Sequence, residues 1–343
     1  MLTRLIRLRW PIPVALLVLG LVVVGAGMVV AGGDDDVLVV YNGRSHYGDE
    51  SVFAAFEEAT GIDVELRGGT APELFERLRR EGEDTPADLL ITTDLANLWR
   101  ADEAGLLEPV TTPVLEEAIP PGLRAGDGAW WALTTRLRVP VVATDRVDPS
   151  EVTGYESLGD PAFRGRTCLR ISSNEYNQSL VADLLAKRGR EATEALLRSW
   201  MDNDPEIIGS DGELLAVMAD GGCDVGLANH YYLARTLAED PDFPVAPAWP
   251  DQQGAGAHAN VSGMGLVAGS DARDDAIALM EYLVSADAQA ELVEQGEFAA
   301  DPDVPPADHI RGWADVRIDP IAVDEAGPLL AEAVELMLEV GWR

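Results

Sequence analysis

Two adjacent tyrosines, Tyr231 and Tyr232, are the residues of this sequence best suited to chemistry. They follow the apolar run 225–228, which predicts a buried strand, and precede the run 233–238, which predicts the start of a helix. Two phenols at such a junction can point into a cleft together, and as phenolates they suit a hard, highly charged cation such as Fe(III). Aromatic packing is the commoner role of such a pair, so both readings stay open for the pair alone.

The elements that must position this pair alternate along the chain. Apolar runs predict strands at 37–41, 62–66, 87–92, 138–143, 167–171, 225–228 and 261–267. Helical periodicity lies between and after them, at 51–60, 72–81, 95–104, 180–187, 191–200, 214–218, 274–284 and 329–340. This alternation predicts an α/β fold with parallel, doubly wound sheets. Ligands of such sheets bind beyond the carboxyl ends of strands, which indicates the loops after Tyr41 and Thr92.

Composition limits the classes of partner. The chain has 343 residues, a formal charge of −35 and a single lysine, Lys187. Because phosphate binding needs a basic surface, nucleic acid is not an expected partner. We find no Gly-x-Ser-x-Gly, His-Glu-x-x-His or Cys-x-x-Cys motif, so an exported hydrolase is a distant alternative and we expect no enzyme.

The N-terminus has the pattern of an export segment. Arg4, Arg7 and Arg9 precede the apolar run 10–30, and small residues around Ala31 form an acceptable cleavage site. The run is also long enough to span a bilayer, so residues 1–31 are either a cleaved signal peptide or a retained anchor. In both cases the positive-inside rule places the remaining chain outside the cytoplasm. In that oxidising compartment Cys168 and Cys223, which lie in or beside predicted strands, either pair as a disulfide or remain buried thiols.

The resemblance to a known family becomes specific at the run Cys168-Leu-Arg-Ile-Ser-Ser-Asn-Glu-Tyr-Asn-Gln-Ser179. This run resembles the signature of ferric-iron-binding proteins, the extracytoplasmic solute receptors of ABC transporters, in the branch that binds bare iron mainly through tyrosines. Further segments resemble the same family in the same order, namely 56–62, 86–90, 94–100, 155–161, 229–235, 258–263 and 340–342.

The resemblance implies a two-lobed α/β fold of the type II periplasmic-binding-protein kind, with a ligand cleft between the lobes. We expect one lobe at 37–137 plus about 255–300, and the other at 138–254 plus about 301–343. It also implies a monomer that carries Fe(III) as its transported ligand, uses no catalytic cofactor and delivers the ion to the permease subunits of an ABC transporter. The alternative is the same receptor fold with another solute, such as an anion, a polyamine or a phosphonate.

The resemblance further implies the metal ligands. Tyr231 and Tyr232 fall on the tyrosine pair of the family, and Tyr176 falls on the tyrosine inside its Ser-Ser-Asn-x-Tyr motif. The family has an Arg-His-Tyr run after its first strand, but here Ser45 separates Arg44 from His46. An ungapped alignment places Ser45 and His46 on the ligand positions, whereas a one-residue shift in the loop restores His46 and Tyr47, the ligands that we expect.

Two arginines complete the expected site. Arg136 and Arg138 match an Arg-x-Arg of the family and could donate to the phenolate oxygens without binding metal, although surface ion pairs are an equally good reading. Asp94 either lies near the cleft or caps the helix that follows it. Glu175, His230 and His258 are near the motifs, but we do not expect them to be ligands.

Overall fold

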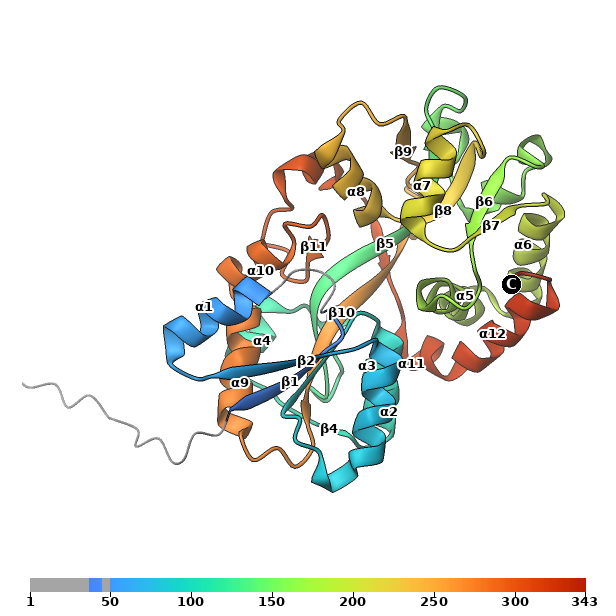
Figure 1. Ribbon diagram of the computed structural model, residues 1–343. Coiled ribbons are helices and arrows are strands. Elements are labelled where there is room, and N and C mark those ends of the chain that lie inside the picture. Colours follow the sequence, from blue (N-terminus) through green and yellow to red (C-terminus); the bar gives the residue numbers. More distant parts are fainter. Residues whose placement is uncertain (1–36, 45–49) are drawn as a thin grey trace, which may run out of the picture. The chain divides into compact units, whose positions relative to one another are not determined.

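The structure is a computed structural model that describes residues 37–44 and 50–343 (Figure 1). The proposed export segment 1–31 and the expected ligands His46 and Tyr47 therefore lie outside the described residues. Within the described part of the chain, no helix is long and apolar enough to cross a membrane.

Residues 38–103 form parallel βαβ units, as predicted. The elements are β1 (Leu38–Asn42), α1 (Glu50–Thr60), β2 (Val64–Gly68), α2 (Ala71–Glu81), β3 (Leu89–Thr92) and α3 (Leu95–Glu103). Strand β1 is buried along its whole length and pairs in parallel with both β2 and β3. Helix α2 begins with a capping box between Thr70 and Glu73, a device that stabilises a helix start by about 1 kcal/mol.

A second parallel group carries the candidate tyrosines. Its elements are β6 (Thr167–Arg170), α5 (Glu175–Arg188), α6 (Arg190–Asp202), β7 (Glu206–Ile208), α7 (Asp211–Ala219), β8 (Val225–Asn229) and α8 (His230–Glu239). Strand β6 lies between β7 and β8 and is parallel to both. Because α5 follows β6 and α8 follows β8, both helices start at the carboxyl ends of neighbouring parallel strands.

Two long strands join these groups, and here the sequence prediction was incomplete. Strand β5 (Trp131–Ala143) and strand β10 (Ala257–Val267) are longer than the predicted 138–143 and 261–267, and they pair antiparallel to each other. Strand β5 pairs with β10 up to Leu137 and with β8 from Arg138 onward. The resulting strand order is β2-β1-β3-β10-β5-β8-β6-β7. The first half of β5 was not predicted because residues 134–136 are polar. Their burial depends on partners that are distant in the sequence.

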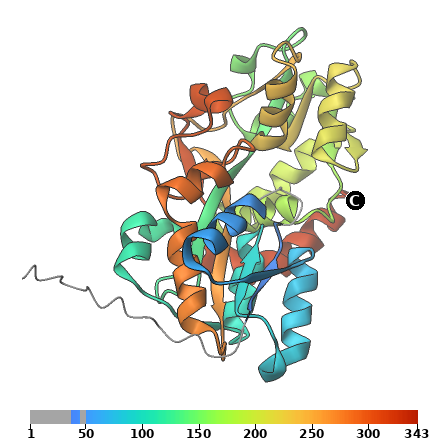
Figure 2. The same cartoon turned by 60° about the vertical axis from the view of Figure 1, so that its left-hand side comes forward.

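The remaining elements cover the edges and faces of these sheets. They are β4 (Leu107–Glu108), α4 (Pro113–Ala118), β9 (Val245–Pro247), α9 (Arg273–Leu283), α10 (Ala286–Leu292), β11 (Phe298–Ala299), β12 (Ile318–Pro320), α11 (Val323–Ala326) and α12 (Leu330–Glu339). The C-terminal helix α12 packs against α5, and the two lie side by side in Figure 1 and Figure 2. Trp342 beyond α12 is fully buried and donates its indole N–H to the carbonyl of Arg170 at 2.8 Å. The chain end thereby supports the strand that leads to Tyr176.

Candidate metal centre

Tyr231 and Tyr232 lie in the first turn of α8, directly after strand β8. The helix begins at His230, three residues before the predicted start, so both phenols sit on the helix and not before it. Their rings are stacked with centroids 4.4 Å apart. Tyr231 is buried and Tyr232 is half-buried. The pair therefore lies at the carboxyl end of a buried strand, where ligands of α/β sheets bind.

Tyr176 occupies the equivalent place on the neighbouring unit, in the first turn of α5 after strand β6. It is buried, and its side chain interacts electrostatically with both Tyr231 and Tyr232. Burial raises the pKa of the Tyr176 phenol above 10, while the nearby Arg136 guanidinium opposes part of that rise. The structure thus brings the three tyrosines together from two helices whose first turns face the same region.

Guanidinium groups surround the phenol cluster. Arg136 lies over the ring of Tyr176, 4.8 Å from its centroid, and Arg235 lies 5.0 Å from the centroid of Tyr231. Arg170 lies 5.8 Å from the centroid of Tyr176. Burial lowers the pKa of Arg170, but Asp211 and the phenols of Tyr232 and Tyr176 outweigh it and raise that pKa overall. These cations can offset negative charge on the phenols.

Sequence reasoning missed two of these arginines, Arg170 and Arg235. Both could have been found from position alone. Arg170 is the last residue of β6, at the carboxyl end of a parallel strand. Arg235 follows Tyr231 by four residues on one helix, so the two side chains share a face.

Arg136 and Asp94 link the cluster to the first half of the chain. Arg136 is buried, donates to the Ser262 hydroxyl at 3.1 Å and lies 3.8 Å from the Asp94 carboxylate. Asp94 caps helix α3 by accepting from the amide of Ala96, and it also contacts residues beside the phenols. The reading of Asp94 as the cap of α3 is therefore confirmed.

Arg138 has a different role from the one expected. Its guanidinium donates to the side chains of Asn177, Asp211 and Asn229 and to the carbonyl of Leu227, at 2.9–3.3 Å. None of the hydrogen bonds described for this guanidinium goes to a tyrosine hydroxyl. Asn177 lies in the first turn of α5 and Asn229 precedes α8. Arg138 therefore links the starts of the two helices that carry the tyrosines. Its described hydrogen bonds do not reach the phenol oxygens.

Beside the segment that holds His46 and Tyr47, Arg44 anchors the end of β1. The Arg44 guanidinium is buried and contacts Thr134, Ser262 and Glu297, each at 2.8 Å. Burial alone would raise the pKa of the Glu297 carboxyl, but Arg44 and Arg136 hold that pKa below its ordinary value. The end of β1 is thus fixed to β5 and β10.

Two histidines near the motifs have structural partners. The His230 ring stacks on Phe298, and its Nδ1 accepts from the amide of Leu137 at 3.0 Å. Burial lowers the pKa of His230 to about 4. The His258 ring is paired with Asp183 at 2.8 Å. Glu175, next to Tyr176, has a pKa raised by burial and by Asp94. The His230 ring also makes an edge-to-face contact with Tyr231, with the ring centroids 6.2 Å apart.

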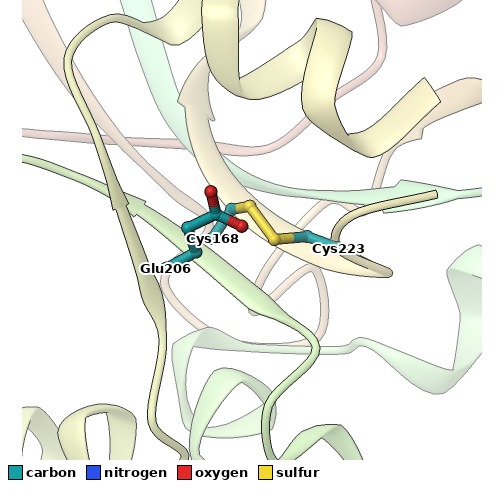
Figure 3. A group of neighbouring side chains, drawn as sticks. All are labelled: Cys168, Glu206 and Cys223. Atoms are coloured by element: carbon teal, nitrogen blue, oxygen red, sulfur yellow. A yellow bond between two sulfur atoms is a disulfide. The ribbon is translucent and has the colours of Figure 1, made fainter. Parts of the chain in front are cut away.

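A separate group of metal-ligating atom types consists of Cys168, Cys223 and Glu206. Figure 3 shows the two sulfur atoms joined as a disulfide with the Glu206 carboxylate beside them. The Cα atoms of the two cysteines are 5.8 Å apart, within the usual range for a disulfide. Metal binding requires free thiolates, so this group is a cross-link between β6 and the segment before β8.

A cavity lies next to the first turns of α5. It has a volume of about 420 Å³ and lies between α3, α5 and the C-terminal segment around α12. Asp94, Glu175 and Ser179 contribute to its wall. Two parallel α/β units joined by the long strands β5 and β10 are the construction of a two-lobed solute receptor.

Comparison with known proteins agrees with that class. Residues 51–317 match the family model described as bacterial extracellular solute-binding protein. The chain is 39% identical over 321 residues to "Iron uptake protein A1" of Synechocystis, covering 91% of this chain and 89% of that protein. It is 28% identical over 316 residues to the "Fe(3+)-binding periplasmic protein" of Serratia marcescens, covering 91% and 92% of the two chains.

Solved structures show the same fold. A Trichodesmium protein in complex with iron and citrate ligands superimposes with a TM-score of 0.84 at 35% identity, covering 90% of this chain and all of that one. A ferric binding protein from Campylobacter jejuni gives a TM-score of 0.82 at 30% identity, covering 89% of this chain. The chain therefore belongs to the bacterial extracellular solute-binding protein family, and within it to the branch of ferric-binding receptors.

Proposed function

We propose that this receptor binds Fe(III) through the phenolate oxygens of Tyr176, Tyr231 and Tyr232. The observation that carries the proposal is the gathering of three phenols from the first turns of α5 and α8. A bound cation strongly lowers the pKa of the groups that coordinate it. A phenol with an ordinary pKa near 10 can therefore bind the ion as phenolate at neutral pH.

Charge balance favours a trivalent ion at this site. Three phenolates carry three negative charges, equal to the charge of Fe(III). The buried arginines Arg44, Arg136 and Arg138 each lie close to a buried carboxylate, namely Glu297, Asp94 and Asp211. Within each of these pairs the two charges cancel, whereas Arg170 and Arg235 also lie beside the phenols. The three phenolates alone match the charge of the ion, so the ligand set itself needs no external anion.

The names of the relatives support the same ligand. Two similar Synechocystis proteins are named iron uptake proteins, and more distant relatives are named ferric iron-binding proteins. We propose that His46 and Tyr47 supply the remaining ligands from the loop after β1, since a neutral imidazole is an adequate iron ligand.

The proposed site implies a transport cycle outside the cytoplasm. We propose lobes at 37–137 plus about 255–300 and at 138–254 plus about 301–343, which close on the ion by hinge motion. The closed monomer delivers its iron to an ABC permease. Residues 1–31 act as a cleaved signal or a retained anchor. Protonation of the phenolates, or reduction to the less charged Fe(II), releases the ion.

Metal analysis of the protein purified without added metal tests this function. We expect about one iron per chain, retained through dialysis and removed by acid or by a reductant with a chelator. Titration of the metal-free protein with Fe(III), with phosphate and with spermidine separates iron from the alternative solutes. Tight binding of phosphate or spermidine without iron would refute the proposal.

A further inference from the structure

The carboxylate of Asp94 connects two helices from different halves of the chain. Asp94 precedes α3, whereas Ser179 lies on α5, more than eighty residues later. The Ser179 hydroxyl donates to Asp94 Oδ2 at 2.7 Å, and both residues are fully buried. With the lobe boundaries proposed above, α3 belongs to the first lobe and α5 to the second. The hydrogen bond therefore joins the lobes.

The other contacts of Asp94 show that this carboxylate is a junction between several elements. Its Oδ1 accepts from the amide of Ala96, which caps α3. Its Oδ2 also accepts from the Asn260 amide at 2.7 Å, and the Arg136 guanidinium lies 3.8 Å away. Asn260 is on β10 and Arg136 is on β5, the two long strands that join the parallel groups. Both carboxylate oxygens are thus already used by the protein.

Two routes connect this junction to the phenol cluster. Ser179 follows Tyr176 by three residues on α5, so the two side chains share a face of the helix. Arg136, beside Asp94, also lies over the Tyr176 ring at 4.8 Å. Separation of α3 from α5 would therefore break the Asp94–Ser179 bond right beside a proposed iron ligand.

We propose that Asp94 and Ser179 form a latch that holds the lobes closed and sets how fast the bound ion leaves. This inference rests on the iron-binding function proposed above. Two-lobed receptors open by hinge motion, and a buried hydrogen bond to a charged group is stronger than one between neutral groups. Opening breaks the bond to Ser179, whereas the cap on α3 lies within one lobe and persists.

Two substitutions test the hydrogen bond between Asp94 and Ser179. Ser179→Ala removes the hydroxyl donor and leaves a residue that favours helix. Asp94→Asn retains an oxygen that can cap α3, but its amide group offers too few acceptors for Ala96, Ser179 and Asn260 together. Ser199→Ala is the matched control, because Ser199 donates only to the carbonyl of Leu196 in its own helix.

The experiment measures iron transfer from the full chain to excess EDTA, together with small-angle scattering of the metal-free and iron-loaded protein. Ser179→Ala and Asp94→Asn should release iron about tenfold faster than the unaltered protein. Their iron absorbance band should stay at the same wavelength, because the phenols are intact. Their metal-free forms should have a larger radius of gyration, and Ser199→Ala should match the unaltered protein in every measurement.

Three outcomes contradict the latch. Unchanged release rates in both variants would overturn it, and so would unchanged radii of gyration. A shifted absorbance band would assign Asp94 and Ser179 to the coordination of the metal instead. If the unaltered protein binds no iron, the proposed function fails, and the scattering comparison alone then decides whether the latch exists.

Discussion

The guanidinium of Arg136 lies over the ring of Tyr176, 4.8 Å from its centroid, and both side chains are buried. Arg136 comes from β5 and Tyr176 from α5, so a cation of one element faces the phenol of another. Replacement by methionine should weaken iron binding about tenfold, because Arg136 opposes the rise that burial causes in the pKa of the Tyr176 phenol and so favours its phenolate form. Lysine should recover part of the loss, since it keeps the charge but not the planar group. Competition with a chelator measures both affinities, and equal affinity in Arg136→Met would show that Arg136 does not act on the phenol.

The disulfide between Cys168 and Cys223 should contribute strongly to stability. It closes a loop with a sequence separation of 55 residues, and loop-closure entropy predicts a stabilisation of about 4 kcal/mol for that length. The double variant Cys168→Ala/Cys223→Ala should unfold at a clearly lower urea concentration. The unaltered protein treated with a phosphine reductant is the control, and it should unfold close to the variant. If neither the double substitution nor reduction changes the urea midpoint, the disulfide does not stabilise the fold.

The hydrogen bonds of Arg138 should contribute to the stability of the fold more than to iron coordination. Arg138 forms two hydrogen bonds to Asp211, and both side chains are almost fully buried. Arg138→Met leaves a buried carboxylate without its main partner, which costs about 3–5 kcal/mol. Thermal melting of the metal-free protein checks this loss. Arg198→Met, which removes an exposed pair with Glu194, should shift the melting temperature little.

The stability of the metal-free protein should fall between pH 6.5 and pH 4. Burial lowers the pKa of His230 from 6.5 to about 4. In that window the unfolded chain binds a proton that the folded chain does not, so the free energy of unfolding decreases as the pH falls. Urea unfolding at several pH values measures the slope. His230→Gln should flatten it, and an equal slope in the variant would assign the effect to other groups.

The sequence was sufficient for the parts of the site that lie next to strand ends. Tyr176, Tyr231 and Tyr232 belong to recognisable motifs, and the strands before them are short apolar runs bounded by polar residues. The start of α8 was predicted three residues late, because His230 and the tyrosines interrupt the apolar pattern of the helix. Their place in the first turn depends on the strand that precedes them.

The rest of the site depends on contacts between distant residues. Thr134, Thr135 and Arg136 lie outside the predicted strand, yet they are buried in β5 because partners such as Glu297 and Ser262 surround them. Asp211 gave no signal in the sequence, although it is the carboxylate that holds Arg138. A linear pattern shows which residues are polar, but it does not show which polar residues will meet in the interior.

The visible absorption spectrum of the iron-loaded protein tests the central claim most directly. Coordination by phenolates predicts a phenolate-to-Fe(III) charge-transfer band that is lost or strongly weakened in Tyr231→Phe. Tyr282→Phe is the control, because Tyr282 packs on Phe56 away from the cluster, and it should keep the band. A colourless iron-loaded protein, or a band that persists unchanged in Tyr231→Phe, would contradict coordination by these tyrosines.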